Sequence, residues 1–147
     1  LWRKYMKSQV KIINEITKLR FKISKQKELI NYYEVMSHSL GGSDYSTERV
    51  DGTRNLEAPF VKWIYKKIDA EEKLKVMEDD LEAKVNDLST LLDKLEQPEY
   101  QMVLTYRYVL NMDWVDIPKV MNYSISSVYR LHRDALYALK IMIVRDS

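Results

Sequence analysis

The side chains of this chain that could do chemistry gather between residues 107 and 133. Four are cations and the others carry hydroxyl or apolar groups: Arg107, Lys119, Ser124, Ile125, Ser126, Tyr129, Arg130 and Arg133. Helical spacing places those from 124 to 133 on the outward face of one helix. A guanidinium group offers forked donors that match guanine edges and phosphates. The pattern therefore predicts contacts to nucleic acid.

We expect Arg130 to be the main base-edge contact, because only Arg130 and Arg133 present forked donors on this face. Arg133, Lys119 and Arg107 are expected to hold phosphates. The serine and tyrosine hydroxyls could bond to a base edge or a phosphate, and Ile125 could pack on a thymine methyl group. The alternative is that all of these are ordinary surface residues of a helical bundle.

Two helices joined by a tight turn would position these residues. Asn122 falls at the turn, where φ > 0 is needed and Asn is the next-best residue after Gly. Ser124 follows at an N-cap position. The residues placed for apolar contact between the two helices are Ile117, Met121, Val128 and Leu131. This is the pattern of a DNA-binding helix-turn-helix, whose second helix enters the major groove.

The surrounding residues predict a three-helix domain over residues 98–147. One helix is expected over 99–110, packing through Met102 and Val103, and the last over about 124–144. We expect Trp114 to anchor the core of this domain. We expect His132, beside the packed face, to form an interhelical hydrogen bond rather than to bind a ligand.

Upstream, residues 1–97 predict two long helices, an oligomerisation region. The first helix is expected over about 2–36, with a heptad-like stripe of Ile12, Ile16, Leu19, Ile23, Ile30 and Tyr33 and with Gln9 and Gln26 in the same seam. A loop is expected over 37–57, containing Arg49 and Arg54. The second helix is expected over about 60–95, with the stripe Phe60, Ile64, Leu74, Leu81, Val85, Leu88, Leu92 and Leu95. The fold class is therefore all-α: an antiparallel helical hairpin or coiled coil, followed by the helix-turn-helix domain.

The net charge of +2 hides a segregation along the chain. Residues 1–36 carry nine Lys/Arg against three Asp/Glu, whereas residues 37–97 carry nine against fourteen. Basic and acidic segments are expected to lie side by side, with a surplus positive face for phosphate. An ordinary solvated charged helix is the alternative.

The segment from Tyr106 to Leu136 resembles small bacteriophage proteins from Gram-positive hosts, the ArpU- and RinA-type regulators of late genes. The similarity rests on residues 106–109, Trp114, Ile117, 121–124, 128–132 and 135–136. Their C-terminal domain in turn resembles the helix-turn-helix of region four in bacterial sigma factors. The resemblance implies a phage-encoded, sequence-specific DNA-binding protein that regulates transcription.

Two positions depart from that family pattern. Pro118 stands where a small residue is usual, and it should prevent a helix from running through this point. We therefore expect the helix to begin near Ile117, with 113–116 forming a separate turn. At residues 125–127, Ile-Ser-Ser replaces the usual Arg, Glu or Gln, so base-reading contacts at the start of the helix are reduced.

The leading hypothesis is an oligomeric transcriptional regulator that binds double-stranded DNA. Two alternatives stay open: a DNA-packaging adaptor resembling small terminase subunits, and a sigma-mimicking module that binds host RNA polymerase or another regulator. No nucleophile motif, phosphate loop, cofactor motif or metal-ligand spacing is present, which favours a non-enzyme. The lack of Cys and of any apolar run of about 20 residues predicts a cytoplasmic protein of a bacterial host cell, without a membrane partner.

Overall fold

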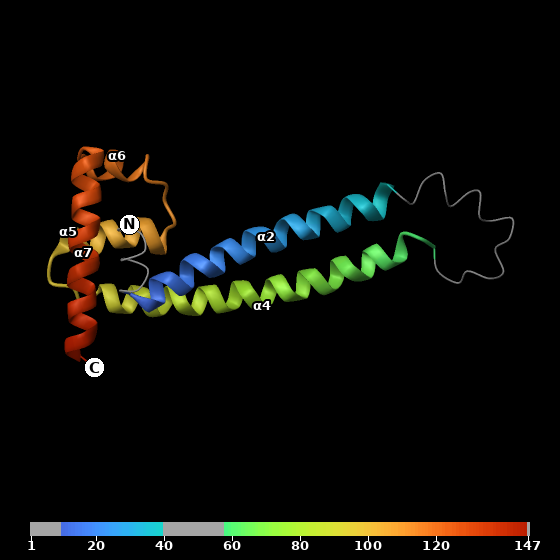
Figure 1. Cartoon of the computed structure of the whole chain (residues 1–147), viewed down its shortest axis with the longest axis horizontal. Helices are drawn as coiled ribbons and strands as arrows, with labels where there is room; N and C mark the ends of the chain where they lie inside the picture. The colour runs from blue at the N-terminus through green and yellow to red at the C-terminus, as the bar shows by residue number, and fades with distance from the viewer. Residues whose placement is uncertain (1–9, 40–57, 147) are drawn as a thin grey trace, which may run out of the picture. The chain divides into compact units, whose positions relative to one another are not determined.

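The computed structural model describes residues 10–39 and 58–146, and every regular element within these ranges is helical. The elements in chain order are α2 (Lys11–Ser39), α4 (Val61–Leu92), α5 (Pro98–Leu104), the π-helical turn η2 (Thr105–Val109), α6 (Ile117–Met121) and α7 (Ile125–Asp146) (Figure 1). The predicted all-α class is thus confirmed for the described part of the chain.

The described residues divide into two compact units. The first unit contains residues 10–19 and 81–146, and the second contains residues 20–39 and 58–80. The first unit therefore combines the start of α2 and the end of α4 with all the shorter elements. The predicted domain boundary between residues 97 and 98 stays a prediction.

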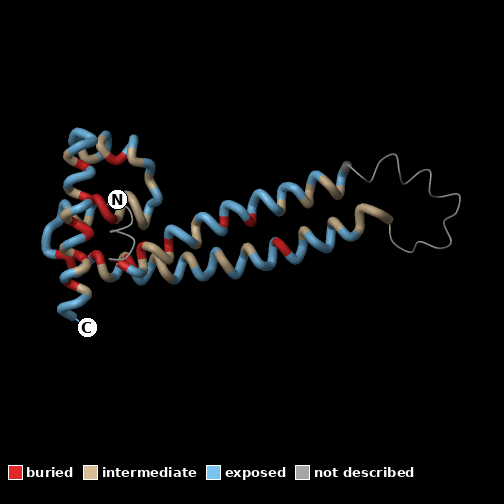
Figure 2. Tube along the Cα trace, viewed as in Figure 1, coloured by how far each residue is buried: buried red, intermediate tan, exposed pale blue. Residues whose placement is uncertain are grey.

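The first unit holds the larger hydrophobic core, where most of the buried segments in Figure 2 gather. Its fully buried side chains include Ile16, Leu88, Leu92, Val103, Leu104, Ile117, Val128, Ala135 and Leu139. On α7 the buried residues Val128, His132, Ala135, Leu139 and Met142 recur at steps of three and four, which place one face of that helix against the others.

The second unit is a pair of antiparallel helix segments with few buried side chains. The Gln26 amide donates from α2 to the Ala70 carbonyl on α4 at 3.0 Å. Lys67 pairs with Glu34. Gln26 therefore occupies the seam, as its place in the heptad stripe predicts, and the small Ala70 side chain leaves room for it to reach the backbone.

Three expectations for the long helices need correction. The first helix continues to Ser39, so the expected loop does not begin at 37, and the rest of that segment, with Arg49 and Arg54, lies outside the described residues. Ile13, which was not predicted, is buried on α2, and the predicted Ile12 is partly buried against the same core. Ile64 is 37% exposed. Ala70 faces α2, and the helical spacing between the two residues turns Ile64 away from that face.

The helix expected over 99–110 is present, but its second half is π-helical rather than α-helical. α5 ends at Leu104 and widens into η2, where the Leu110 N–H donates to the Thr105 carbonyl at 2.9 Å. Asn111 then takes a left-handed conformation with φ 56°, which ends the helical run. Met102, expected on the packed face, is exposed, and Leu104 is buried instead.

Candidate nucleic-acid interface

α6 begins at Ile117, as the proline predicts. Pro118 lies in the first turn of α6, where its missing N–H would have no helical partner. The preceding residues form a separate turn in which the Asp116 N–H donates to the Asp113 carbonyl at 3.0 Å. The expected separate turn at 113–116 is confirmed.

The α6–α7 connection is a left-handed cap. Asn122 has φ 61° and ψ 43°, the region that favours Gly and tolerates Asn. The Tyr123 N–H donates back to the Pro118 carbonyl at 3.0 Å, as in a Schellman motif. These contacts fix the direction in which the chain leaves α6.

Ser124 caps the N-terminus of α7. Its Oγ accepts a hydrogen bond from the Ser127 N–H at 3.2 Å, which confirms the expected N-cap. The same Oγ lies 2.9 Å from Ser127 Oγ. Because the Ser124 hydroxyl is engaged in capping α7, its role in the structure is to fix where α7 begins.

The remaining candidates on the first turns of α7 all stand in solvent: Ile125, Ser126, Tyr129, Arg130 and Arg133. Lys119 is exposed on α6. Arg133 lies 3.5 Å from the Asp134 carboxylate, whereas Arg130 has no hydrogen-bond or ion-pair partner within the described residues. The unpaired Arg130 guanidinium is therefore the most available forked donor of this face.

Arg107 is held within the protein. Its Nη1 donates to the Met112 carbonyl at 2.7 Å, and its guanidinium carbon lies 4.8 Å from the centre of the Trp114 ring. Both contacts bind η2 to the segment before α6. Its expected phosphate contact stays a prediction, and Arg107 has a structural task besides.

Trp114 packs against α7. Its ring meets the His132 ring edge-on at 4.7 Å and the Tyr129 ring at 5.0 Å. Trp114 is therefore a packing anchor, as expected, and it steadies Tyr129 on the candidate face.

His132 forms the interhelical hydrogen bond that its position predicts. Its Nε2 lies 2.7 Å from the hydroxyl of Tyr108 on η2. Burial, with the nearby Arg107 charge, lowers the pKa of His132 to about 4, and burial raises the pKa of Tyr108 to about 12. The pair is therefore neutral at physiological pH. This partly buried contact joins η2 to α7, the helix that carries the candidate face. Tyr108 belongs to the residues that carry the family resemblance, but no sequence signal predicted its hydrogen bond to His132, because that contact depends on the π-helical turn.

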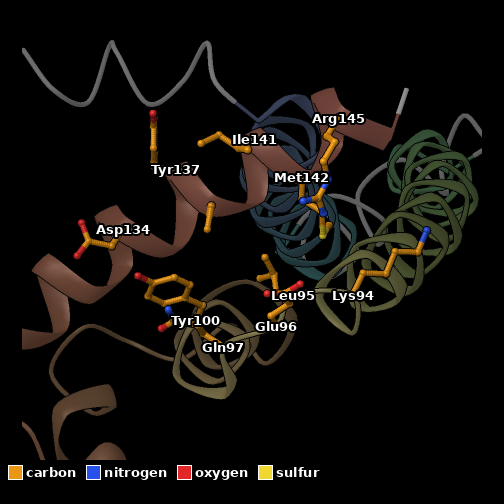
Figure 3. A pocket seen from close by; sticks show the side chains of 11 residues that line it. Lys94, Leu95, Glu96, Gln97, Tyr100, Asp134, Tyr137, Ile141, Met142 and Arg145 are labelled. Atoms are coloured by element: carbon orange, nitrogen blue, oxygen red, sulfur yellow. The ribbon is translucent and has the colours of Figure 1, made fainter.

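A separate groove of about 390 Å³ involves the C-terminal half of α7. Figure 3 shows its lining, which comes from residues 94–97, Tyr100 and α7 residues from Asp134 to Arg145. None of the eight candidate DNA contacts lines it. Arg145 in this groove is therefore a useful reference cation on the same helix.

Comparison with protein families finds one that covers most of the chain. The model of the family described as Protein of unknown function (DUF1492) matches residues 40–140. The chain belongs to this family. The match includes α4 and all the candidate contact residues, which lie between Arg107 and Arg133. No curated protein and no solved structure matches the chain.

The described residues hold no group of three His, Cys, Asp or Glu side chains that could bind a metal ion. Among the helices of residues 10–39 and 58–146, none has the length and apolar character to cross a membrane.

Proposed function

We propose that this protein is a phage-encoded regulator that binds a specific double-stranded DNA site through α7 and acts on transcription as an oligomer. In this proposal α2 and α4 form a helical hairpin, and α5, α6 and α7 form a trihelical helix-turn-helix domain. The observation that carries it is the exposed polar and basic start of α7, set behind the left-handed Asn122 and the Ser124 cap. The resemblance to ArpU- and RinA-type regulators supports the late-gene role.

The geometry of α7 suits the major groove. A helix about 10–12 Å across fits a groove about 12 Å wide. Binding guanine would cost Arg130 no internal contact with a described residue, whereas Arg133 would give up its pair with Asp134. Arg130 is therefore the residue on which base preference should depend most.

The test is fluorescence anisotropy with DNA from the promoter region of the phage's own genome and with random DNA, at about 0.15 M salt. Arg130→Ala should lower affinity for the specific site by about 10- to 100-fold and change random-DNA binding little. Lys119→Ala should weaken both by similar factors and reduce the salt slope by about one.

Arg145→Ala is the matched control, because Arg145 lies on the same helix but lines the remote groove. It should leave both affinities within about twofold. Equal affinity of the unaltered protein for promoter and random DNA would overturn the proposed sequence specificity.

One observation favours a second candidate, a protein-interaction module. Exposed apolar side chains lie on and around the α6–α7 turn: Val115, Val120, Tyr123 and Ile125. Such side chains suit a protein partner such as host RNA polymerase better than a phosphate backbone. If this candidate is right, Val120→Ser and Ile125→Ser should abolish polymerase binding while Arg130→Ala leaves it intact.

A further inference from the structure

The second unit buries few side chains for the length of its two helices. Its buried side chains among the described residues are Ile23, Gln26 and Ala70, of which one is polar and one is small. The same unit exposes large apolar side chains along both helices. The described residues therefore leave apolar surface of this helix pair uncovered, which marks an interaction site.

On α2 the exposed apolar side chains form a stripe opposite the seam. Phe21, Leu29 and Val35 are all exposed, with Phe21 at 67%. At 100° per residue these three fall within a sector of about 120°, and Ile23 and the other seam residues point away from it. The ring of Tyr32 meets the Trp63 ring of α4 edge-on at 6.0 Å, so Tyr32 is not part of this stripe. We call this stripe the α2 outer face.

On α4 a second stripe has the same relation to its seam. Tyr65, Ile68 and Val76 are exposed, with Val76 at 69%, and the half-buried Val61 continues the row. Ala70, which receives Gln26, lies roughly on the opposite side of the helix. We call this stripe the α4 outer face.

The two outer faces match in register. Within the unit, Gln26 contacts Ala70, and the Tyr33 ring lies near the Trp63 ring. Moving seven residues toward the C-terminus on α2 therefore corresponds to moving seven residues toward the N-terminus on α4. If a second copy stands beside the first in the same orientation, its α4 meets this α2 in the same antiparallel register. To within one residue, this pairs three sets of apolar side chains: Phe21 with Val76, Leu29 with Ile68, and Val35 with Val61.

The charges on the two faces bear on this pairing. The same register brings Lys25 of the α2 outer face level with Glu72 of the α4 outer face, which attracts, and brings Glu28 level with Asp69, which repels. The α4 outer face carries Glu72, Asp69 and Asp79, so two α4 outer faces packed together would repel one another more strongly. The acidic α4 outer face is therefore better matched to the α2 outer face, which carries Lys25, than to a second α4 outer face.

We propose that the α2 outer face binds the α4 outer face of a second copy of this chain. Each copy then keeps one free face of each kind, because the contact joins two different surfaces. Such a heterologous contact builds a ring when the rotation closes and a filament when it does not. The proposal defines the oligomer of the proposed function, and it does not depend on DNA binding.

The test uses two variants of the full chain, each altered on one face. Phe21→Lys with Leu29→Lys removes the α2 outer face, and Ile68→Lys with Val76→Lys removes the α4 outer face. All four side chains are exposed, so circular dichroism should show unchanged helicity. Light scattering without DNA should find an assembly for the unaltered protein and a 17.6 kDa monomer for each variant.

Mixing the two variants in equal amounts gives the decisive readout. Each variant retains the face that the other lacks, so the mixture should form a dimer and stop there. Val115→Lys is the matched control, because Val115 is equally exposed outside the second unit, and it should leave assembly unchanged.

A charge exchange tests the register itself. Lys25→Glu and Glu72→Lys should each weaken assembly, and the double variant should restore it. A monomeric unaltered protein, or variants whose mixture stays monomeric, would overturn the proposal. Because no DNA is present, these results are independent of whether Arg130 reads a base.

Discussion

At the scale of single residues, His132 is the side chain whose environment has the largest consequence. It is 3% exposed, bonds to Tyr108, and meets Trp114 edge-on. Its Nδ1 is buried without a hydrogen-bond partner among the described residues. Protonation would therefore place a charge in an apolar site beside the Arg107 guanidinium, with no acceptor to receive the second proton.

This environment predicts that acid destabilises the first unit. The pKa of His132 is about 4 when folded against an ordinary 6.5, so the unfolded chain binds the proton first as pH falls. Stability is complete above pH 6.5 and declines toward pH 4, by about 1 kcal/mol at pH 5.5 and about 3 kcal/mol in full. Urea denaturation at pH 7.5 and pH 5.5 measures the difference.

His132→Gln supplies the comparison, because Gln does not titrate and can still bond the Tyr108 hydroxyl. Relative to the unaltered protein, the variant should lose more stability at pH 7.5 than at pH 5.5, and its own stability should therefore depend less on pH. His38 and the carboxylates are present in both proteins, so their contributions cancel. Equal pH dependence in the two proteins would contradict the assignment to His132.

Sequence reasoning found the role of His132 but not the task of Arg107. His132 sits beside a periodic apolar face, and that periodicity is readable in the chain. Arg107 reaches Met112 and Trp114 only because η2 widens and Asn111 turns left-handed. That conformation depends on tertiary contacts, which leave no periodic signal.

At the scale of elements, the start of α7 should depend on two residues of the turn. Ser124→Ala removes the cap on the Ser127 N–H and should cost about 1 kcal/mol in urea denaturation. Asn122→Ala should cost about 1–2 kcal/mol because its φ is 61°, and Asn122→Gly should cost nothing.

Ser126→Ala is the control for this pair. Among the described residues its hydroxyl is hydrogen-bonded only to Ser124 Oγ, at 3.3 Å, so stability should change by less than about 0.5 kcal/mol. If Ser124→Ala and Ser126→Ala were equally stable, the cap would not determine where α7 begins.

The elements that the sequence predicts well are those with local signals. Pro118 restricts φ, whereas Asn122 tolerates φ > 0, so the start of α6 and the turn after it follow from single residues. The inward face of α4 is harder to predict, because Ala70 is small and Gln26 is polar, and neither stands out as a core residue. Ile64 is more hydrophobic than either, and a prediction from hydrophobicity alone therefore places it on the wrong face.

At the scale of the whole molecule, composition and the scarcity of Gly and Pro were sufficient to predict the all-helical class of the described residues. The outer faces of the second unit were not predicted. Each helix carries an outer stripe of apolar residues as well as its seam stripe. A heptad pattern in the sequence does not tell which of the two stripes packs within the chain and which would pack on another copy.

Assembly and DNA reading should be coupled through multivalency. The start of α7 offers Arg130 and few other base-reading groups, so one copy should bind weakly. Several linked copies would raise affinity by about 10²–10⁴ without any new base contact. A protein altered at both Phe21 and Val76 should therefore keep its preference for the promoter over random DNA while losing affinity by that factor, measured by anisotropy.

The size of the assembly then separates regulation from packaging. A small assembly that binds half-sites about one helical turn apart favours the regulator. A closed ring of many copies, seen by native mass spectrometry, favours a packaging adaptor, because a ring can encircle or wrap DNA at many equivalent points. If the altered monomer bound the promoter as tightly as the assembly, α7 alone would supply the affinity, and the outer faces would serve another purpose.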